Sequence, residues 1–496
     1  MIRTRFAPSP TGYVHIGNLR TTLFEYLFAK KNKGVFIIRV EDTDQERLVP
    51  GAMEGMLKTL QWVGIIPDEG VTLDSAGNVT QKGDFGPYIQ SERLPIYKKY
   101  AEELLNNGSA YYAFDTTEEL SAMRERQQAR KLPTKYDREH MRNQYTLSAD
   151  EVKNILASDA PRVVRLKVPA SEEVVFDDIV HGKTVFDCKE IDDQVLLKSD
   201  GFPTYHLAVV VDDHLMEITH VIRGDDWISS TPKHLLLYKA FGWMPPLHAH
   251  LPLVIGGDKL KLSKRKGDVS TESYRAKGYL PEALVNFLAF LGWNPGTEKE
   301  LYSMEELIKD FSLEKVSKAG AIFNVEKLDW YNKEYLKCIP LSELAIRARQ
   351  WFEQAEWFEK LTMNNEQITN AIALERERVT TLAELPAAIK FIFELPDYSK
   401  ELLVWRKGTL EEVKKILPEL KNYLDTISIQ EWNKALLEQK IGGWIKQKNY
   451  STGNVLWPLR VALSGQQNSP GPYEIAVVLG KDDTLNRLAI ALQKLV

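Results

Sequence analysis

A turn-rich loop runs into an apolar-periodic segment between Ala7 and Phe24, with the sequence APSPTGYVHIGNLRTTLF. Its two prolines stiffen the loop, while Gly12 and Gly17 allow the backbone to approach a ligand closely. His15 stands at the expected mouth of a helix, where free amides and the positive end of the helix dipole attract phosphate. A neutral imidazole can donate a hydrogen bond there without carrying a fixed charge. The same residues also fit an ordinary capped helix with a loop histidine.

A second cluster lies between Asp258 and Ser270, DKLKLSKRKGDVS, where four lysines and one arginine surround Ser263. Like charges at this density repel one another unless they are solvated or face an anion. The segment therefore predicts either a solvated surface loop or a second anion-binding element.

The elements around the first loop form a βαβ unit. Residues Ile2 to Phe6 have strand character, and apolar residues from Leu19 to Leu27 recur at helical spacing. The run Lys30 to Gly34 closes this helix with basic residues and a glycine, and Val35 to Val40 is an apolar run of strand length. Such a unit implies a parallel sheet, whose ligands bind at the carboxyl ends of the strands, where the first loop lies.

The rest of the chain divides into regions that differ in composition and periodicity. His220 to Gly224 predicts a buried strand and Ser230 to Trp243 a helix, while residues from about 95 to 200 mix charged helical pieces with extended ones. We interpret that middle region as an insertion that splits an open α/β sheet. From about residue 330 helical periodicity dominates, as in Leu341, Leu344, Ala345, Ala348, Trp351 and Phe352. Ser464 to Pro472 reads as a loop.

Composition narrows the class of protein. The 496 residues suggest several domains, and 64 basic against 69 acidic residues give 64 − 69 = −5, which argues against a uniformly basic nucleic-acid coat protein. Cys188 and Cys338 are too far apart in sequence for a disulfide framework or a zinc knuckle of closely spaced cysteines. No apolar run approaches a membrane span and the N-terminus has no leader-like pattern, so we expect a cytoplasmic protein without membrane contact.

Two motifs together carry a family resemblance. HIGN at 15–18 and KLSKR at 261–265 resemble the two ATP-site motifs of class I aminoacyl-tRNA synthetases. The flanking segments are RFAPSPTG (5–12), RVEDTD (39–44), GPYIQSER (86–93), LLKSDGFPTYHLAVVVDDHLMEITHVIRGDDW (196–227) and FNVEKLDWYN (323–332). With them the chain resembles the glutamyl-tRNA synthetases of the bacterial and organellar type, densely up to about residue 335 and more sparsely beyond it.

The resemblance implies an α/β Rossmann-type parallel-sheet catalytic domain, split by an α+β insertion and followed by an all-α C-terminal anticodon-binding region. The implied domains are 1–95, the first half of the Rossmann domain; 96–204, an inserted domain that binds the tRNA acceptor end; 205–257, the second half; 258–338, the KLSKR loop and stem-contact domain; and 339–496, the helical anticodon-binding region.

The resemblance also implies ATP-dependent attachment of L-glutamate to the 3′ end of tRNA(Glu) through a glutamyl-adenylate, with release of AMP and pyrophosphate. Lys264 and His15 would be the catalytic residues. The implied ATP-binding set is Thr11, His15, Gly17, Asp226, Trp227, Lys261 and Lys264, with His15 and the amide of Gly17 at the helix mouth. Mg²⁺ is expected to accompany the nucleotide.

A glutamate pocket needs arginine for a carboxylate and an acid for the ammonium group. By resemblance Arg5, Tyr205 and Arg223 bind carboxylate, Glu41 binds the ammonium, and Ala7 and Ser9 line the loop. From the residues alone, Arg5 and Glu41 could equally pair with one another and Tyr205 could be core packing.

For tRNA, the resemblance implies that the insertion holds the acceptor end and the helical third reads the anticodon. The expected anticodon contacts are Arg378, Arg460, Pro470 and Tyr473. Their alternative is a solvated helix face with exposed arginines. Because only Cys188 lies in the insertion, where some relatives carry a zinc knob, we expect no metal there. We also expect a monomer.

Four other functions compete. A glutaminyl-tRNA synthetase would have β-barrels in its anticodon region, and a truncated relative that glutamylates a modified tRNA base would lack the last third. A nucleotidyltransferase acting on a small cofactor precursor would share the helix mouth but not the helical third, and a non-catalytic RNA-binding module would need no ATP. Whether the enzyme also charges tRNA(Gln) stays open, although Arg378 favours the strict form, and we expect tRNA to bind before glutamate is activated.

Overall fold

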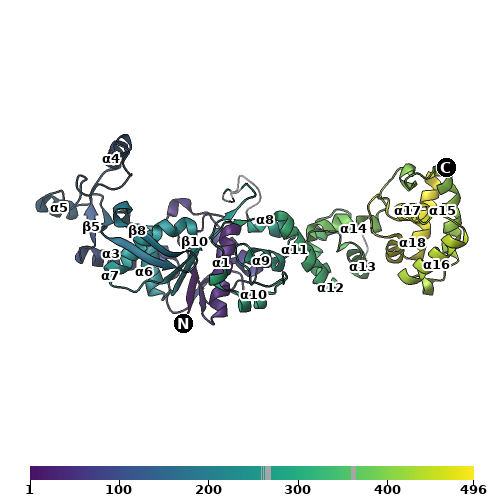
Figure 1. Cartoon of the computed structure of the whole chain (residues 1–496), viewed down its shortest axis with the longest axis horizontal. Coiled ribbons are helices and arrows are strands. Elements are labelled where there is room, and N and C mark those ends of the chain that lie inside the picture. The colour runs from purple at the N-terminus through teal and green to yellow at the C-terminus, as the bar shows by residue number, and fades with distance from the viewer. Residues whose placement is uncertain (259, 261, 263–269, 359–364) are drawn as a thin grey trace. The chain divides into compact units, whose positions relative to one another are not determined.

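The computed structural model describes residues 1–258, 260, 262, 270–358 and 365–496. It contains two compact units (Figure 1). Unit 1 comprises residues 1–274 and 281–327, and unit 2 comprises residues 275–280 and 328–496.

The first sheet of unit 1 contains the predicted βαβ unit. Its strands, in spatial order, are β1 (Arg3–Phe6), β2 (Val35–Ile38), β3 (Glu69–Leu73) and β4 (Val79–Lys82), and its crossover helices are α1 (Ile16–Lys31) and α2 (Ala52–Trp62). The first three strands are parallel and β4 is antiparallel. The strand predicted to reach Val40 ends at Ile38, because Val40 leaves β1 and pairs with Ile89.

A second sheet lies beside β1. Its strands, in spatial order, are β10 (His220–Gly224), β11 (Leu247–Leu251), β7 (Glu173–Asp178) and β8 (Gly182–Asp187). The first three are parallel and β8 closes a hairpin with β7. The amide of Thr219, just before β10, donates to Arg3 O of β1 at 3.0 Å, so the carboxyl ends of β1 and β10 are brought to the same edge. Residues 173–187 lie within the segment predicted as the insertion, yet their hairpin belongs to this second sheet.

Helices cover the second sheet and share a core with the inserted segment. They are α3 (Leu94–Asn106), α6 (Tyr205–Leu215) and α7 (Thr231–Phe241) (Figure 1). Leu104, Val210 and Leu237, one from each helix, are buried in a single cluster with Leu166 and Leu196 of the inserted segment. Two of these helices carry a proline in their first turn, where the missing N–H costs no helical hydrogen bond.

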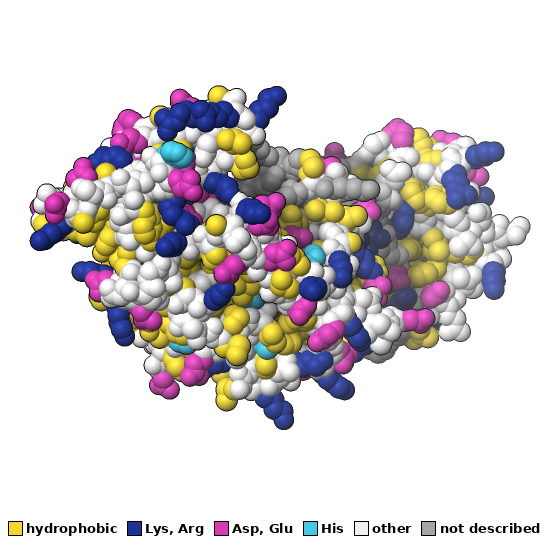
Figure 2. Space-filling model, turned by 60° about the vertical axis from the view of Figure 1, so that its left-hand side comes forward, with side chains coloured by type: hydrophobic (Ala, Val, Ile, Leu, Met, Phe, Trp, Pro, Cys, Tyr) yellow, Lys and Arg dark blue, Asp and Glu magenta, His cyan; other side chains and the backbone are white. Residues whose placement is uncertain are grey.

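The remaining elements of unit 1 are smaller. An antiparallel sheet contains β5 (Ala110–Ala113), β6 (Val163–Leu166) and β9 (Val195–Leu197), accompanied by α4 (Thr117–Ala129) and α5 (Ala149–Leu156). Further along are the pair β12 (Val254–Ile255) and β13 (Ala321–Ile322) and the helices α8 (Thr271–Ala276), α9 (Pro281–Ala289) and α10 (Met304–Asp310). Basic and acidic side chains are interspersed over the face of unit 1 seen in Figure 2, in accord with the balanced composition.

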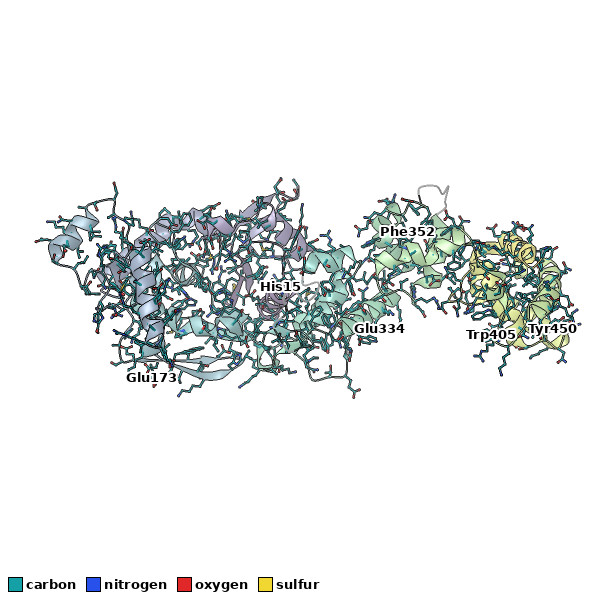
Figure 3. All side chains as sticks on the ribbon, turned by 90° about the horizontal axis from the view of Figure 1, so that it is seen from above. His15, Glu173, Glu334, Phe352, Trp405 and Tyr450 are labelled. Atoms are coloured by element: carbon teal, nitrogen blue, oxygen red, sulfur yellow. The ribbon has the colours of Figure 1, made fainter. Side chains whose placement is uncertain are left out.

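Unit 2 is helical, as its periodicity predicts. Its elements are α11 (Val325–Cys338), α12 (Leu341–Glu353), α13 (Asn365–Glu375), α14 (Leu385–Phe393), α15 (Leu410–Asp425), α16 (Lys434–Gln447), α17 (Thr452–Ser464) and α18 (Pro472–Lys494). No strand occurs among its described residues. Leu344, Ala348 and Phe352 form the buried stripe of α12, with Phe352 labelled in Figure 3. Arg487 of α18 is buried and donates to the carbonyl oxygens of Phe391 and Leu463, which ties three helices together.

Candidate active site

A cavity of about 610 Å³ lies where the loops after β1 and β10 meet the start of α1. It is lined by every predicted ATP- and glutamate-binding residue that the structure describes: Arg5, Ala7, Ser9, Thr11, His15, Gly17, Glu41, Tyr205, Arg223, Asp226 and Trp227. These residues come from several segments of the chain, so the fold brings together what the sequence separates. Lys261 and Lys264 lie outside the described residues.

The mouth of α1 is organised by His15, which is its N-cap (labelled in Figure 3). Its Nδ1 accepts a hydrogen bond from the amide of Gly17 at 3.0 Å, so the neutral ring carries its proton on Nε2, the nitrogen that can donate. The amide of Gly17, expected to contact ATP, is therefore bonded to the histidine ring. A Cβ at this position would lie 3.3 Å from Nδ1, which shows why a glycine suits the close approach of the ring.

The C-terminal end of the basic segment lies beside this histidine. Ser270, its last residue, forms a β-bridge with His15. The amide and hydroxyl of Thr271 both donate to Val14 O at 3.0 Å. Leu262, between the two predicted lysines, lines the cavity. Of the described residues in this segment, Leu262 lines the cavity and Ser270 pairs with His15, and the roles of Lys261 and Lys264 stay predictions.

The loop after β10 supplies an aromatic wall. The ring of Trp227 is 42% exposed and lies 4.8 Å from that of Tyr205, centroid to centroid. Gly224 ends β10 three residues before it with φ −65°, and a Cβ there would lie 2.6 Å from Asp226 Oδ1, so a larger residue would require the Asp226 side chain to move. An exposed indole at a cavity rim suits stacking on a flat heterocycle.

Arg5 and Glu41 do not pair with one another. Arg5 Nε donates to Asp213 Oδ1 at 3.1 Å, and its terminal nitrogen Nη1 lies 3.6 Å from Glu25 Oε1. Glu41 Oε1 instead accepts from Arg39 Nη2 at 3.0 Å. The alternative that these two predicted residues simply neutralise each other is wrong, and both face the cavity.

Arg39 is the central residue that sequence reasoning missed. It is fully buried and also donates to Asp213 Oδ1 at 2.7 Å. Burial alone would raise the pKa of Asp213, but Arg5 and Arg39 hold this pKa below its ordinary value. Burial raises the pKa of Glu41 in spite of Arg39, and raises that of Glu25 well above the usual range. Arg39 and the two aspartates at 212 and 213 stood in segments used for the resemblance, but their pairing is a long-range property.

Arg223 is held on three sides. Its Nη1 donates to the hydroxyl of Tyr205 at 2.9 Å, its Nη2 to Thr231 Oγ1 at 2.8 Å, and its Nε to His250 Nε2 at 3.1 Å. Tyr205 is half-buried at the cavity, so its role is not core packing alone. Burial raises the pKa of its phenol, which keeps the hydroxyl protonated.

The cavity wall contains further residues that the sequence did not single out. They include Asn18, Arg20, Thr21, Glu25, Thr43, Asp44, Lys198 and Thr204. Thr43, Asp44, Lys198 and Thr204 lie inside the quoted family segments, which was the available signal. Arg20 is buried and donates to Leu291 O at 3.1 Å, a contact that no local pattern indicates.

All four predicted anticodon residues lie on unit 2. Arg378 is exposed and pairs with Glu375 at 3.0 Å. Arg460 lies over the ring of Trp457 at 4.5 Å from its centroid. Burial and then the nearby charge of Arg378 lower the pKa of Arg460, so these two arginines are neighbours.

The other two anticodon candidates flank the start of α18. Pro470 is buried in the loop before the helix, and Tyr473 is half-buried in its first turn. Pro470 therefore shapes this loop, whereas the ring of Tyr473 is partly accessible.

Two negative observations hold for the described part of the chain. No three His, Cys, Asp or Glu side chains there gather as they would around a metal ion. Among the same residues, none of the helices has the length and apolar character needed to cross a bilayer.

Comparison with known proteins shows which family this chain is similar to in sequence and in fold. Residues 1–330 match the family model described as "tRNA synthetases class I (E and Q), catalytic domain", and residues 343–492 match "Anticodon binding domain". The glutamate–tRNA ligase of Chloroherpeton thalassium is 46% identical over 100% of this chain and 98% of its own length. That of Clostridioides difficile is 45% identical over 98% of each chain.

A crystal structure of a glutamate tRNA ligase from Elizabethkingia meningosepticum, in complex with its amino acid, superimposes with a TM-score of 0.90 at 37% identity and covers 100% of both chains. The catalytic match extends over most of the chain, and the helices of unit 2 differ from the β-barrels expected of a glutaminyl-tRNA synthetase. The chain therefore belongs to the glutamate–tRNA ligase family of class I aminoacyl-tRNA synthetases.

Proposed function

We propose that this enzyme attaches L-glutamate to the 3′ end of tRNA(Glu) through a glutamyl-adenylate, and that the described cavity is where the adenylate forms. The observation that carries this proposal is the convergence of eleven predicted residues, from separate segments, on one cavity. Its wall combines arginines for carboxylates, a glutamate for an ammonium group and an indole for an adenine ring.

The chemistry needs no protein nucleophile. The α-carboxylate of glutamate attacks the α-phosphate of ATP and pyrophosphate leaves; a hydroxyl of the terminal ribose of tRNA then attacks the glutamyl carbonyl and AMP leaves. Both steps are accelerated by holding the reactants in line and by placing positive charge where negative charge develops.

ATP would lie against the mouth of α1. His15 Nε2–H donates to phosphate, the backbone around Thr11 shapes the loop, and Trp227 with Asp226 holds the adenosine end. Lys264, with Lys261 beside it, neutralises the phosphates as pyrophosphate leaves. Mg²⁺ enters with ATP as part of the substrate and supplies further charge neutralisation.

Glutamate would lie between the buried network around Asp213 and the buried network around Arg223. Arg5 is held through Nε by Asp213 and its Nη1 lies 3.6 Å from Glu25 Oε1, so Nη2 is the nitrogen that would reach a substrate carboxylate. Arg223 and the hydroxyl of Tyr205 form the second carboxylate site, Glu41 binds the ammonium, and Ala7 and Ser9 complete the loop.

Recognition of tRNA would be divided between the units. The inserted strands and helices of unit 1 hold the acceptor end, and Arg378, Arg460 and Tyr473 of unit 2 contact anticodon bases by stacking and edge hydrogen bonds. We further propose that the enzyme is a cytoplasmic monomer, that it discriminates against tRNA(Gln) and that tRNA binds before glutamate is activated.

The test is attachment of labelled glutamate to purified tRNA(Glu) and tRNA(Gln) with ATP and Mg²⁺. We expect rapid charging of tRNA(Glu), little charging of tRNA(Gln), and a loss of about 100-fold or more in kcat for Lys264→Ala. Lys266→Ala, which removes one positive charge from the same basic segment, is the matched control and should retain most activity.

Charging of both tRNAs would make the enzyme non-discriminating. Failure to charge either tRNA, in a protein that stays folded and binds ATP, would reject the proposal in favour of a cofactor nucleotidyltransferase.

A further inference from the structure

Arg223 binds groups of the protein through all three of its donor nitrogens. Its Nε donates to His250 of β11 and its Nη2 to Thr231 of α7. Both partners are fully buried. Nη1 donates to the hydroxyl of Tyr205, and Nη2 also donates to the carbonyl oxygen of Trp227 at 3.3 Å; both of these residues line the cavity.

His250 is in turn bound by a carboxylate. Its Nδ1 lies 2.6 Å from Asp178 Oδ2, and neither side chain is exposed. Asp178 Oδ1 also accepts from the amides of Val180 and His181 at 3.0 Å and 2.9 Å. Because every neighbour of this carboxylate is an N–H group, Asp178 is an ionised acceptor and Nδ1 of His250 must be the donor.

The proton positions in this network are therefore determined. With its proton on Nδ1, His250 presents a lone pair on Nε2 toward Arg223 Nε. Thr231 Oγ1 accepts from Arg223 Nη2, so its own proton points to His250 Nε2, 3.1 Å away. The single lone pair of Nε2 is therefore shared between Arg223 Nε–H and Thr231 Oγ1–H, while Asp178 holds the opposite nitrogen of the ring. A buried polar network connected in this way is rigid. Burial lowers the pKa of His250 in spite of Asp178, so the ring is neutral, as this arrangement requires.

We propose that Asp178 and His250 form a positioning pair that fixes the plane of the Arg223 guanidinium and thereby sets the affinity for the amino-acid substrate. This inference rests on the proposed role of Arg223 in binding a substrate carboxylate. An arginine side chain has many rotamers, and a fork of donors recognises a carboxylate well only when its plane is held. The pair also makes the pocket depend on β7, since Asp178 ends the strand that joins β11 from the predicted insertion.

The experiment compares two variants at 250 with a neighbour. His250→Phe keeps a ring but removes both nitrogens, whereas the amide oxygen of His250→Gln can still accept from Arg223 Nε. His248→Phe is the matched control, because His248 lies on the same strand, is similarly buried and stacks parallel to His250 at 6.1 Å. The hydrogen bond from Arg223 Nε goes to the ring of His250 and not to that of His248. KM for glutamate, KM for ATP and kcat are measured by ATP–pyrophosphate exchange with tRNA(Glu) present.

We expect His250→Phe to raise KM for glutamate about tenfold, the change that follows from losing one hydrogen bond to a charged group. KM for ATP should stay within about twofold, His250→Gln should recover most of the loss, and His248→Phe should behave like the wild type. Thr231→Val is nearly isosteric and removes the hydroxyl that accepts from Nη2 and faces His250 Nε2. It should raise KM for glutamate severalfold and serves if His250→Phe does not fold.

A merely structural role predicts a different pattern: KM values for both substrates and kcat would shift together, and Gln at 250 would be no better than Phe. That pattern would overturn the inference. Arg223→Lys separates it from the proposed function. If Arg223→Lys leaves KM for glutamate unchanged, the role of Arg223 itself fails; if it raises this KM while His250→Phe and Thr231→Val do not, only the positioning role fails.

Discussion

The cavity of unit 1 and the predicted anticodon face of unit 2 both use arginines, but they hold them in different ways. Arg5, Arg39 and Arg223 are buried and bound by several groups each, whereas Arg378 pairs with Glu375 and stays exposed. Buried charges require matched partners, because an unpaired charge in a low-dielectric interior is very costly. Adenylate formation benefits from such fixed charges, while single-stranded bases are read by accessible side chains that adapt to them.

The largest expected difference concerns Asp213, the carboxylate shared by Arg5 and Arg39. Asp213→Ala leaves two buried guanidinium groups without this partner and should destabilise unit 1 by about 3–5 kcal/mol. Arg349→Ala, which breaks an exposed ion pair with Glu353 in unit 2, should cost less than about 1 kcal/mol. Urea denaturation gives the free energies of unfolding, and hydrogen exchange assigns each change to peptides of one unit. Equal losses would contradict the contrast between the two regions.

A substitution on the predicted anticodon face should affect the binding of tRNA. Arg378→Ala should raise KM for tRNA(Glu) about fivefold to tenfold through loss of one base contact, with KM for glutamate unchanged. Arg349→Ala is the matched control, because Arg349 is an exposed arginine paired within α12 of the same unit. Aminoacylation kinetics at varied tRNA concentration measure the effect. An equal response of both variants would mean that general basicity, and not position, is being measured.

The buried carboxylates should have opposite pH dependences. Burial raises the folded-state pKa of Glu25, so its contribution to stability is present below the ordinary value of 4.5 and is lost as pH rises through the raised pKa. Asp213 has a lowered pKa, so its contribution is present above its ordinary value of 3.8 and is lost as pH falls. Glu25→Gln should therefore gain stability relative to the wild type as pH rises above the ordinary value of 4.5. Urea unfolding across this rise in pH tests the sign, and a constant difference would contradict it.

The smallest effect should come from the surface of unit 1 itself. Glu54 and Lys58 form an exposed pair one turn apart on α2. Glu54→Ala should change the free energy of unfolding by less than about 0.5 kcal/mol, because solvent screens the pair and its side chains lose entropy on pairing. Glu54 and Asp213 both lie in unit 1, but only Asp213 is buried. Comparing the two variants therefore shows whether burial of the carboxylate decides the loss of free energy of unfolding.

Many helices, strands and site residues of this protein can be predicted from the sequence, because they depend on residue patterns that are local. The periodicity of 341–352 predicts α12, the run 220–224 predicts β10, and the family resemblance predicts which residues gather at the cavity. A helix or buried strand depends on neighbours within a few residues, and family motifs preserve the types of side chain that a site needs.

Tertiary structure alone decided which charges pair and which strands join. Arg5 binds Asp213 across 208 positions in the sequence, and His250 binds Asp178 across 72. The β7–β8 hairpin belongs to the second sheet because Asp178 meets His248 in register, although its residues lie in a segment that reads as the insertion. No local pattern selects among several arginines and carboxylates of equal charge; burial in one shared, low-dielectric space selects them, because each buried charge must find its partner there.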